Sequence, residues 1–465
     1  MKASIVTIIY IAEIILAATG LNAQSLPKDQ VIDTVRCIAA KDQSYSLYLP
    51  AGYDPKKAWP LIMVFDPAAR GKTAVMVFSA AAKKYGFIAA CSNNARNGSL
   101  SNNFQAASAV LKDVTGRFST DPARIYLAGF SGGSRFATTL ALTQQGFAGV
   151  IGCGAGLPND NSILPGQVPG LVYYGIAGYR DMNYIEMHDL ANYLTGRTKI
   201  IPFTRFFDGG HEWPETSLIT EAVGWIVMKE MTGKKNQADQ ATIGEIATGI
   251  KNLIGKSQAS GNQEEAVMYM RFAARDFQGT PYGSEFMKIL SEGERSPRYA
   301  SSVKDWNRVA SREQEKKDLY VNYLTALVYS PVFPDSAMTW WRNEVGSLTR
   351  TRDKGSISNS MMAYRLLNFI SILCSEQGSG MFRNGGYSSA SVMFRICTLS
   401  DSENPQNYYN LARAEAALGH TRESTDALAS AVSHGLGSRK TVESEPVFSA
   451  IKNDEKFRSL ISRLK

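Results

Sequence analysis

Histidine and cysteine are the chemically active residues that this sequence has least of. Its 465 residues include four histidines and five cysteines. No Cys-x-x-Cys pair and no His/Cys cluster has the spacing of a metal site, so we expect neither a metal ion nor another cofactor. The cysteines lie far apart in the chain, which favours buried free thiols and leaves a disulfide between Cys374 and Cys397 open in an oxidising compartment.

Runs of positive charge and repeated long apolar runs are also missing. The net charge of +8 is spread along the chain, so nucleic acid is not an expected partner. One apolar run, over residues 5–18, follows Lys2 and precedes small residues around Ala23. This pattern predicts a signal peptide over residues 1–23, cleaved after Ala23, and therefore an exported protein that is periplasmic or extracellular. Glu13 interrupts the run, and the alternative is an uncleaved N-terminal anchor.

Short apolar runs alternate with helical patterns over the first half of the chain. Such alternation is typical of crossover units in a mostly parallel sheet with helices on both faces. We therefore expect an α/β domain over residues 24–232. The expected strands are 31–40, 45–49, 60–65, 86–91, 124–129, 147–153, 171–178 and 199–207, and the expected helices are 103–118, 182–194 and 218–231.

The second half of the chain is different in kind. Residues 232–242 are polar and are expected to form a linker, and a helical pattern then predicts an all-α domain over 243–465. Residues 407–432 match a tetratricopeptide-like helical hairpin, with a generic hairpin as the alternative. The matching packing positions are Tyr408, Leu411, Ala412, Gly419, Leu428 and Ala431. A weaker copy would pair a helix at 364–374 with one at 389–397.

The segment Gly129-Phe130-Ser131-Gly132-Gly133 stands between an expected strand and an expected helix. Gly-x-Ser-x-Gly in that context is the pattern of a nucleophile elbow, in which a tight turn exposes the serine hydroxyl and the glycines prevent backbone collisions. Ser131 is therefore the predicted nucleophile.

A serine nucleophile needs a base and an orienting carboxylate. His211 lies in a loop after a strand, where this sheet architecture places its active sites, and is the predicted base. Asp181 follows the strand at 171–178 and is the predicted acid, although an aspartate there could simply cap a helix. Asp208 and Glu186 are the alternatives for the acid.

The developing oxyanion needs hydrogen-bond donors. The N–H of Gly132 is one expected donor, and Ala68, with Ala69 behind it, is the candidate for the second because Pro67 has no N–H. Phe130 and Trp213 are candidates for an aromatic wall that binds substrate, with ordinary packing as the alternative.

At this point the sequence resembles the α/β-hydrolase superfamily, and more narrowly the secreted esterases of the polyhydroxybutyrate-depolymerase and feruloyl-esterase-like group. The stretches that carry the resemblance lie within about residues 40–230 and include YSLYLPAGYDPKKAWPLIMVFDP, KKYGFIAACSNNARNG, DPARIYLAGFSGGSRFA, GYRDMNYIEM and GGHEWPE. The resemblance implies the same roles for Ser131, Asp181 and His211. One departure is that Asp66-Pro67 stands where many relatives carry His-Gly.

The expected function is hydrolysis of carboxylic esters, small or polymer-borne, through an acyl-enzyme. A serine peptidase that uses the same three residues is one alternative. Another is an interaction protein whose helical half binds a protein partner while the hydrolase domain is idle.

Overall fold

The computed structural model describes residues 26–158, 168, 170–233, 239–328 and 335–464. The predicted signal peptide and part of the predicted linker lie outside these ranges. The chain forms two compact units, Met1–Trp306 and Asn307–Lys465, and each is described here by itself. No helix of the described ranges combines the length and the apolar character that a membrane span requires.

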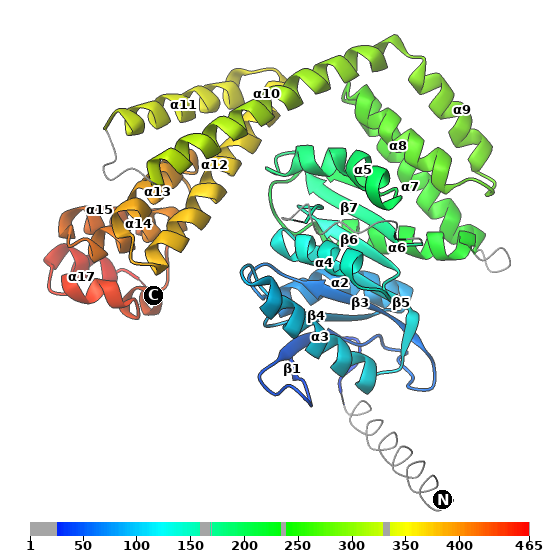
Figure 1. Cartoon of the computed structure of the whole chain (residues 1–465), viewed down its shortest axis with the longest axis horizontal. Helices are drawn as coiled ribbons and strands as arrows, with labels where there is room; N and C mark the ends of the chain where they lie inside the picture. Colours follow the sequence, from blue (N-terminus) through cyan, green and yellow to red (C-terminus); the bar gives the residue numbers. More distant parts are fainter. Residues whose placement is uncertain (1–25, 159–167, 169, 234–238, 329–334, 465) are drawn as a thin grey trace, which may run out of the picture. The chain divides into compact units, whose positions relative to one another are not determined.

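The first unit is built on one sheet of eight strands in the order β1-β2-β4-β3-β5-β6-β7-β8 (Figure 1). The pairs β1–β2 and β2–β4 are antiparallel, and the other neighbours are parallel. The strands are β1 (Val31–Arg36), β2 (Ser44–Tyr48), β3 (Trp59–Phe65), β4 (Ile88–Ser92), β5 (Thr120–Phe130), β6 (Gly149–Cys153), β7 (Val172–Gly178) and β8 (Phe203–Phe207). The predicted mostly parallel sheet is confirmed.

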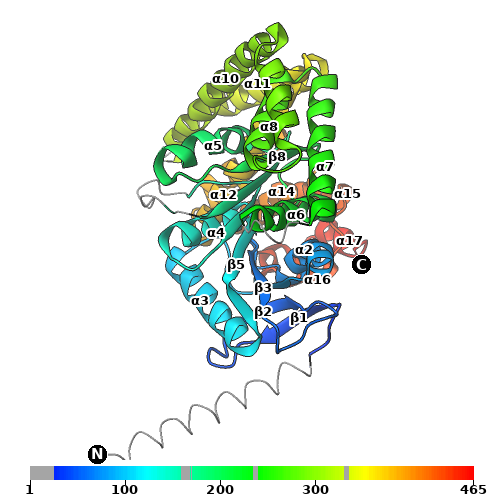
Figure 2. The ribbon, with the colours of Figure 1, turned by 90° about the vertical axis from the view of Figure 1, so that its right-hand side faces the viewer.

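Helices cover both faces of the sheet, which explains why its central strands are apolar along their whole length. Figure 2 shows α2 (Gly71–Tyr85) and α6 (Thr216–Gly233) on one face. The opposite face carries α3 (Leu100–Arg117), α4 (Gly132–Thr143) and α5 (Tyr184–Thr198). In β3, residues 61–65 are buried. The carboxyl ends of β5, β7 and β8 meet at one edge of the sheet, which brings distant parts of the sequence together.

Three further helices belong to the first unit: α7 (Gln240–Ala259), α8 (Gln263–Asp276) and α9 (Gly283–Glu294). Helix α8 covers the edge strand β8, where the Phe206 N–H donates to the Tyr269 hydroxyl at 3.0 Å. Edge strands leave backbone groups unpaired, and a covering helix satisfies them. The first compact unit ends at Trp306, whereas the sequence predicted an α/β domain that ends at residue 232.

Buried carboxylates of α8 strengthen this attachment. Glu265 accepts hydrogen bonds from Tyr179 at 2.7 Å and Ser257 at 2.9 Å. Asp276 accepts from the Trp225 indole at 3.0 Å and from Lys229 at the same distance. Because these carboxylates are buried, their partners are needed to offset lost hydration. A sequence pattern does not reveal such pairings, because they join α8 to α6, to α7 and to the turn after β7.

The second unit is all-helical, as predicted. Helix α10 (Pro297–Val328) begins in the first unit and is followed by α11 (Asp335–Lys354), α12 (Ile357–Arg383), α13 (Tyr387–Ser400), α14 (Pro405–Ala417), α15 (Thr421–Ser433), α16 (Arg439–Glu443), the 3₁₀ helix η2 (Pro446–Ile451) and α17 (Glu455–Ile461). Helices α14 and α15 pack as a hairpin whose turn contains Gly419 at φ +78°. The tetratricopeptide assignment stays a prediction.

Small side chains and thiols lie between the helices of this unit. The Ser424 hydroxyl of α15 donates to the carbonyl of Ala412 in α14 at 2.8 Å. All five cysteines of the chain are buried free thiols. Of these, Cys374 lies on α12 and Cys397 on α13. The disulfide left open by the sequence is thus not formed in this structure, and the Cys397 thiol donates to the Ser371 carbonyl at 3.3 Å.

Candidate active site

Ser131 lies at a sharp turn between β5 and α4. Its backbone has φ +53° and ψ −123°, a region that non-glycine residues rarely occupy. The Ser131 N–H donates to the Cys153 carbonyl of β6 at 2.8 Å, and its carbonyl accepts from Arg135 at 3.0 Å. The strained residue is therefore held by the neighbouring strand on one side and by the first turn of α4 on the other.

The glycines around Ser131 are required by close backbone approaches. A Cβ added to Gly129 would lie 2.4 Å from the carbonyl carbon of Gly133, and a Cβ added to Gly133 would lie 2.2 Å from the carbonyl oxygen of Phe65. Neither backbone atom can move aside as a flexible side chain could. The elbow geometry that the sequence pattern predicted is present.

Ser131, His211 and Asp181 form one continuous hydrogen-bonded chain. His211 Nε2 lies 2.8 Å from Ser131 Oγ, and His211 Nδ1 lies 2.9 Å from Asp181 Oδ1. The Asp181 side chain is 1% exposed and that of His211 is 11% exposed. A buried carboxylate at Nδ1 keeps the proton on that nitrogen, which leaves Nε2 able to accept the serine proton.

Neighbouring polar groups hold the Asp181 segment in place. Asp181 Oδ1 also accepts the N–H of Asn183 at 2.8 Å, and the Asn183 carboxamide donates to the Gly154 carbonyl at 2.7 Å. Asp181 Oδ2 is buried and has no hydrogen-bond partner among the described residues. Asp181 therefore acts mainly through Oδ1, the atom that faces His211.

An ion pair joins α4, which follows Ser131, to α5, which follows Asp181. Both oxygens of Glu186 on α5 accept from Arg135 on α4, at 2.9 and 2.6 Å. Glu186 Oε1 also accepts the N–H groups of Gly156 and Leu157 at 2.9 and 3.0 Å. Glu186, one of the alternatives for the acid, thus has a different set of partners and lies in this bridge.

The loop after β3 is folded around the buried side chain of Asp66. Its carboxylate accepts from Arg70 Nε at 3.0 Å, Arg70 Nη2 at 2.9 Å and the Trp213 indole at 2.9 Å. Burial alone would raise the pKa of Asp66, but the hydrogen bonds from Arg70 and Trp213 outweigh it and hold this pKa below its usual value. Aspartate at this position therefore organises the loop.

The same network uses the backbone donor that the sequence suggested for the oxyanion. The Ala68 N–H donates to Asp66 Oδ1 at 2.8 Å, and the Ala69 N–H donates to the Asp66 carbonyl at 3.0 Å. The expected roles of Ala68 and, behind it, Ala69 do not fit this arrangement, because each N–H already has an acceptor. Gly132 differs, because it is the first residue of α4 and its N–H has no acceptor within the helix.

The two candidate aromatic residues pack against the site itself. The Phe130 ring is 4.8 Å from the His211 ring and 5.4 Å from the Trp213 ring, measured between centroids. Phe130 is buried, and Trp213 is half-buried. Both rings therefore support the imidazole and the Asp66 loop, and their contact with substrate stays a prediction.

The other candidates lie in different surroundings. Asp208, the other alternative for the acid, is paired with Arg180, and His188, which the sequence did not single out, contacts Glu264 and packs against the ring of Trp306. Asn97 is a residue that the sequence analysis did not single out, although it lies in the Asn-rich loop SNNARNG at the carboxyl end of β4. Within the ranges that the structure describes, no three His, Cys, Asp or Glu side chains gather as a metal site.

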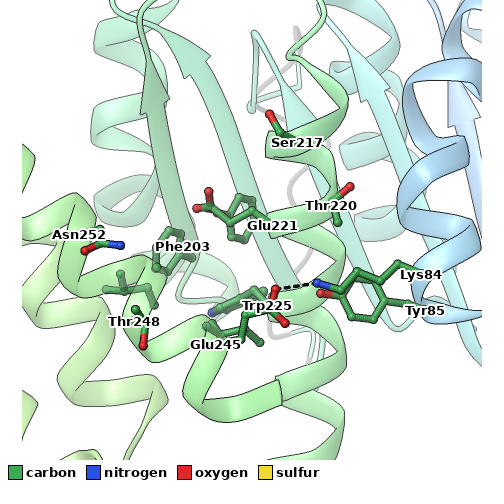
Figure 3. A pocket seen from close by; sticks show the side chains of 14 residues that line it. Lys84, Tyr85, Phe203, Ser217, Thr220, Glu221, Trp225, Glu245, Thr248 and Asn252 are labelled. Carbon is green, nitrogen blue, oxygen red and sulfur yellow. Dashed lines mark hydrogen bonds and ion pairs between the residues drawn. The ribbon is translucent and has the colours of Figure 1, made fainter. Parts of the chain in front are cut away.

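A separate cavity of about 340 Å³ lies between α2, α6 and α7 (Figure 3). Its aromatic lining includes Tyr174, Phe203 and Trp225. Lys84 and Glu245, which form an ion pair, also line the cavity. None of the three residues of the hydrogen-bonded chain lines this cavity. We therefore place the candidate active site at Ser131 and not here.

Neither the protein-family models nor the curated proteins compared with this chain include a match. Solved structures do match in part. An esterase from Pyrobaculum calidifontis is 12% identical, with a TM-score of 0.35, and the match covers 47% of this chain and 92% of that one. For the feruloyl esterase module from Clostridium thermocellum these values are 14%, 0.32, 42% and 86%.

A third structure, esterase B from Lactobacillus rhamnosis, is 14% identical with a TM-score of 0.36, and the match covers 50% of this chain and 99% of that one. These likenesses concern the fold alone. The sheet of the first unit has eight strands, of which the second is antiparallel to both its neighbours, and a helical C-terminal region follows this unit.

Proposed function

We propose that this protein is a serine hydrolase that cleaves carboxylic esters through Ser131, His211 and Asp181. The observation that carries the proposal is the unbroken chain of hydrogen bonds from Asp181 to His211, at 2.9 Å, and from His211 to Ser131, at 2.8 Å. The turn at Ser131, with φ +53°, is the kind of strained backbone that is retained where function requires it.

The proposed reaction proceeds in two halves. His211 Nε2 takes the proton of Ser131 as Oγ bonds to the ester carbonyl carbon, and the carbonyl electron pair moves onto oxygen. The tetrahedral intermediate collapses, the alcohol leaves with the proton held by His211, and an acyl-enzyme remains. Water, activated by His211, then hydrolyses the acyl-enzyme and restores Ser131. Asp181 stabilises the imidazolium in both halves.

The Gly132 N–H is one donor to the oxyanion, because the helix start leaves it without an intrahelical acceptor. No step in this sequence of events calls for a metal ion or an organic cofactor. We further propose that the protein is exported, with cleavage after Ala23, and that its substrate is a small or polymer-borne ester like those of the polyhydroxybutyrate-depolymerase and feruloyl-esterase-like group. A protein partner for the helical region belongs to the same proposal.

The test is labelling by a fluorophosphonate probe together with hydrolysis of a panel of acyl esters and peptide amides. We expect the wild type to be labelled and to hydrolyse esters. Ser131→Ala should abolish labelling and lower kcat by about 10⁵-fold, because the nucleophile is removed while binding remains. Ser101→Ala, on the exposed first turn of α3, is the control and should behave as the wild type.

Two results would contradict the proposal. Cleavage of peptide amides in preference to esters would favour a peptidase that uses the same three residues. A folded wild type that is neither labelled nor active on any ester would favour an interaction protein with an idle hydrolase domain.

A further inference from the structure

Asn97 lies between the two segments that border the oxyanion position. It belongs to the loop that joins β4 to α3, and its backbone N–H donates to the Pro67 carbonyl at 2.8 Å. Pro67 is in the loop after β3, so this hydrogen bond holds Asn97 against that loop. The side chain of Asn97 extends from there to the start of α4.

The Asn97 carboxamide occupies the space above Gly132. A Cβ added to Gly132 would lie 1.8 Å from Asn97 Oδ1 and 2.8 Å from Asn97 Cγ. Any side chain at position 132 would therefore displace Asn97. Gly132 is next to Ser131, and its N–H is the first expected donor to the oxyanion, so the carboxamide lies beside that donor.

This carboxamide is free to act. Asn97 is exposed, and within the described ranges no hydrogen bond is recorded for its side chain. The last torsion of an asparagine side chain is broad and roughly two-fold, so a half-turn exchanges its oxygen and nitrogen at little cost. The Nδ2 group can therefore be turned toward a negative charge that develops at the substrate.

The backbone donors of the neighbouring loop are already used. Pro67 has no N–H, the N–H groups of Ala68 and Arg70 donate to Asp66 Oδ1 at 2.8 and 3.1 Å, and that of Ala69 donates to the Asp66 carbonyl at 3.0 Å. A single donor would leave the oxyanion poorly stabilised, because each such donor contributes a factor of about 10² to 10³ in rate.

We propose that the Asn97 side-chain amide is the second hydrogen-bond donor to the oxyanion formed at Ser131, beside the backbone N–H of Gly132. This inference rests on the proposed hydrolase function. Asn97 keeps its protons throughout, since it donates a hydrogen bond and transfers nothing. Glycine at position 132 has a second role in this arrangement, because it leaves the space that the carboxamide needs.

The test compares Asn97→Ala and Asn97→Asp with Asn102→Ala in the full-length protein. Asn102 is an exposed asparagine in the first turn of α3 and is the matched control. With a p-nitrophenyl ester, both Asn97 variants should lose about 10² to 10³ in kcat with KM changed less than about threefold, because the oxyanion exists only after attack. The rate of fluorophosphonate labelling should fall in parallel.

Gly132→Ala provides a second, independent readout. Its methyl group should displace the carboxamide and lower kcat by a similar factor in the wild-type background. In the Asn97→Ala background the methyl group has room, so adding Gly132→Ala should cost less than about threefold more. This non-additivity is expected only if the two residues act together.

The outcomes separate the two proposals. If Asn97→Ala keeps kcat and the labelling rate within threefold of Asn102→Ala while the wild type is active, the role of Asn97 is refuted and the hydrolase function stands. If the folded wild type is neither labelled nor active, both proposals are refuted together. Thermal unfolding of the Asn97 variants should match that of the wild type, because Asn97 is exposed.

Discussion

At the scale of single residues, the tightest constraint lies on the backbone between Gly129 and Gly133. The chain passes there within van der Waals distance of its own next turn and of the end of β3. Serine at position 131 accepts a positive φ because hydrogen bonds on both sides hold it. The cost of this strain is offset by the rest of the fold, so a small change here should have a large effect.

We expect Gly133→Ala to lower the free energy of unfolding by about 3 kcal/mol or more, because the new Cβ would lie 2.2 Å from the backbone oxygen of Phe65. Gly116→Ala, at an exposed position in the last turn of α3, is the control, since a Cβ there meets nothing within 4 Å. It should stabilise the protein by about 0.5–1 kcal/mol. Urea unfolding of both variants measures the difference, and equal midpoints would contradict this reading of the elbow.

At the scale of elements, helix α5 joins the candidate active site to helices α8 and α10. Asp181 lies just before α5, and Glu186 on the first turn of α5 is paired with Arg135 of α4. Two residues further along, His188 Nε2 lies 2.8 Å from a carboxylate oxygen of Glu264 in α8, and its ring packs against that of Trp306 in α10, with 3.8 Å between the ring centroids. The position of Asp181, the predicted acid, therefore depends on helices that lie outside the sheet domain predicted from the sequence.

Burial alone would lower the pKa of His188, but its contacts with Asp189 and Glu264 outweigh this and raise the pKa to about 9. The charged imidazole is favoured in the folded state, so its stabilising contribution is complete below about pH 6.5 and is lost as the pH rises through about 9. Thermal unfolding of the wild type should shift to lower temperature over this range.

His188→Asn should remove this part of the pH dependence while lowering stability at pH 6.5. His420→Asn, at a half-exposed histidine of the second unit, is the control and should keep the wild-type slope between pH 6.5 and 9.5. An unchanged slope in His188→Asn would show that the His188–Glu264 pair does not link α5 to α8.

At the scale of the whole molecule, the first compact unit includes far more than the sheet and its covering helices. Helix α8 supplies the hydroxyl that pairs the edge of β8, and its Tyr269 and Phe272 rings pack on Phe203, with centroid distances of 6.1 and 5.1 Å. Without these helices an apolar surface and an unpaired strand edge would be open to water, a combination that promotes aggregation.

A chain of residues 26–306 should therefore be a soluble monomer with cooperative thermal unfolding, since it contains α2–α9 and the part of α10 that belongs to the first unit. A chain of residues 26–233, which ends with α6, should aggregate or unfold at a markedly lower temperature. Size-exclusion chromatography and thermal unfolding of the two chains measure this. Equal behaviour would mean that α7–α9 are dispensable and that the shorter domain predicted from the sequence folds by itself.

Local patterns predicted much of the fold and part of the site. Strand β3 could be located because a strand buried on both faces is apolar throughout, and the elbow at Ser131 because its glycines are adjacent in sequence. His211 was predicted as the base because histidine is scarce in this chain and because loops at the ends of parallel strands carry function. No local pattern predicts how the edge of β8 is covered, since Tyr269, the residue that pairs with it, lies far along the chain.

The sequence by itself determined the alternation of strands and helices and the turn at Ser131, and it predicted Asp181 and His211 as acid and base, because each of these depends on neighbouring residues and on the order of elements. Only the tertiary structure decided that the N–H of Ala68 is used by Asp66, that Asn97 fills the space above Gly132, and that α7–α9 belong with the sheet. These are contacts between segments that are distant in sequence, and they arise only when packing brings those segments together.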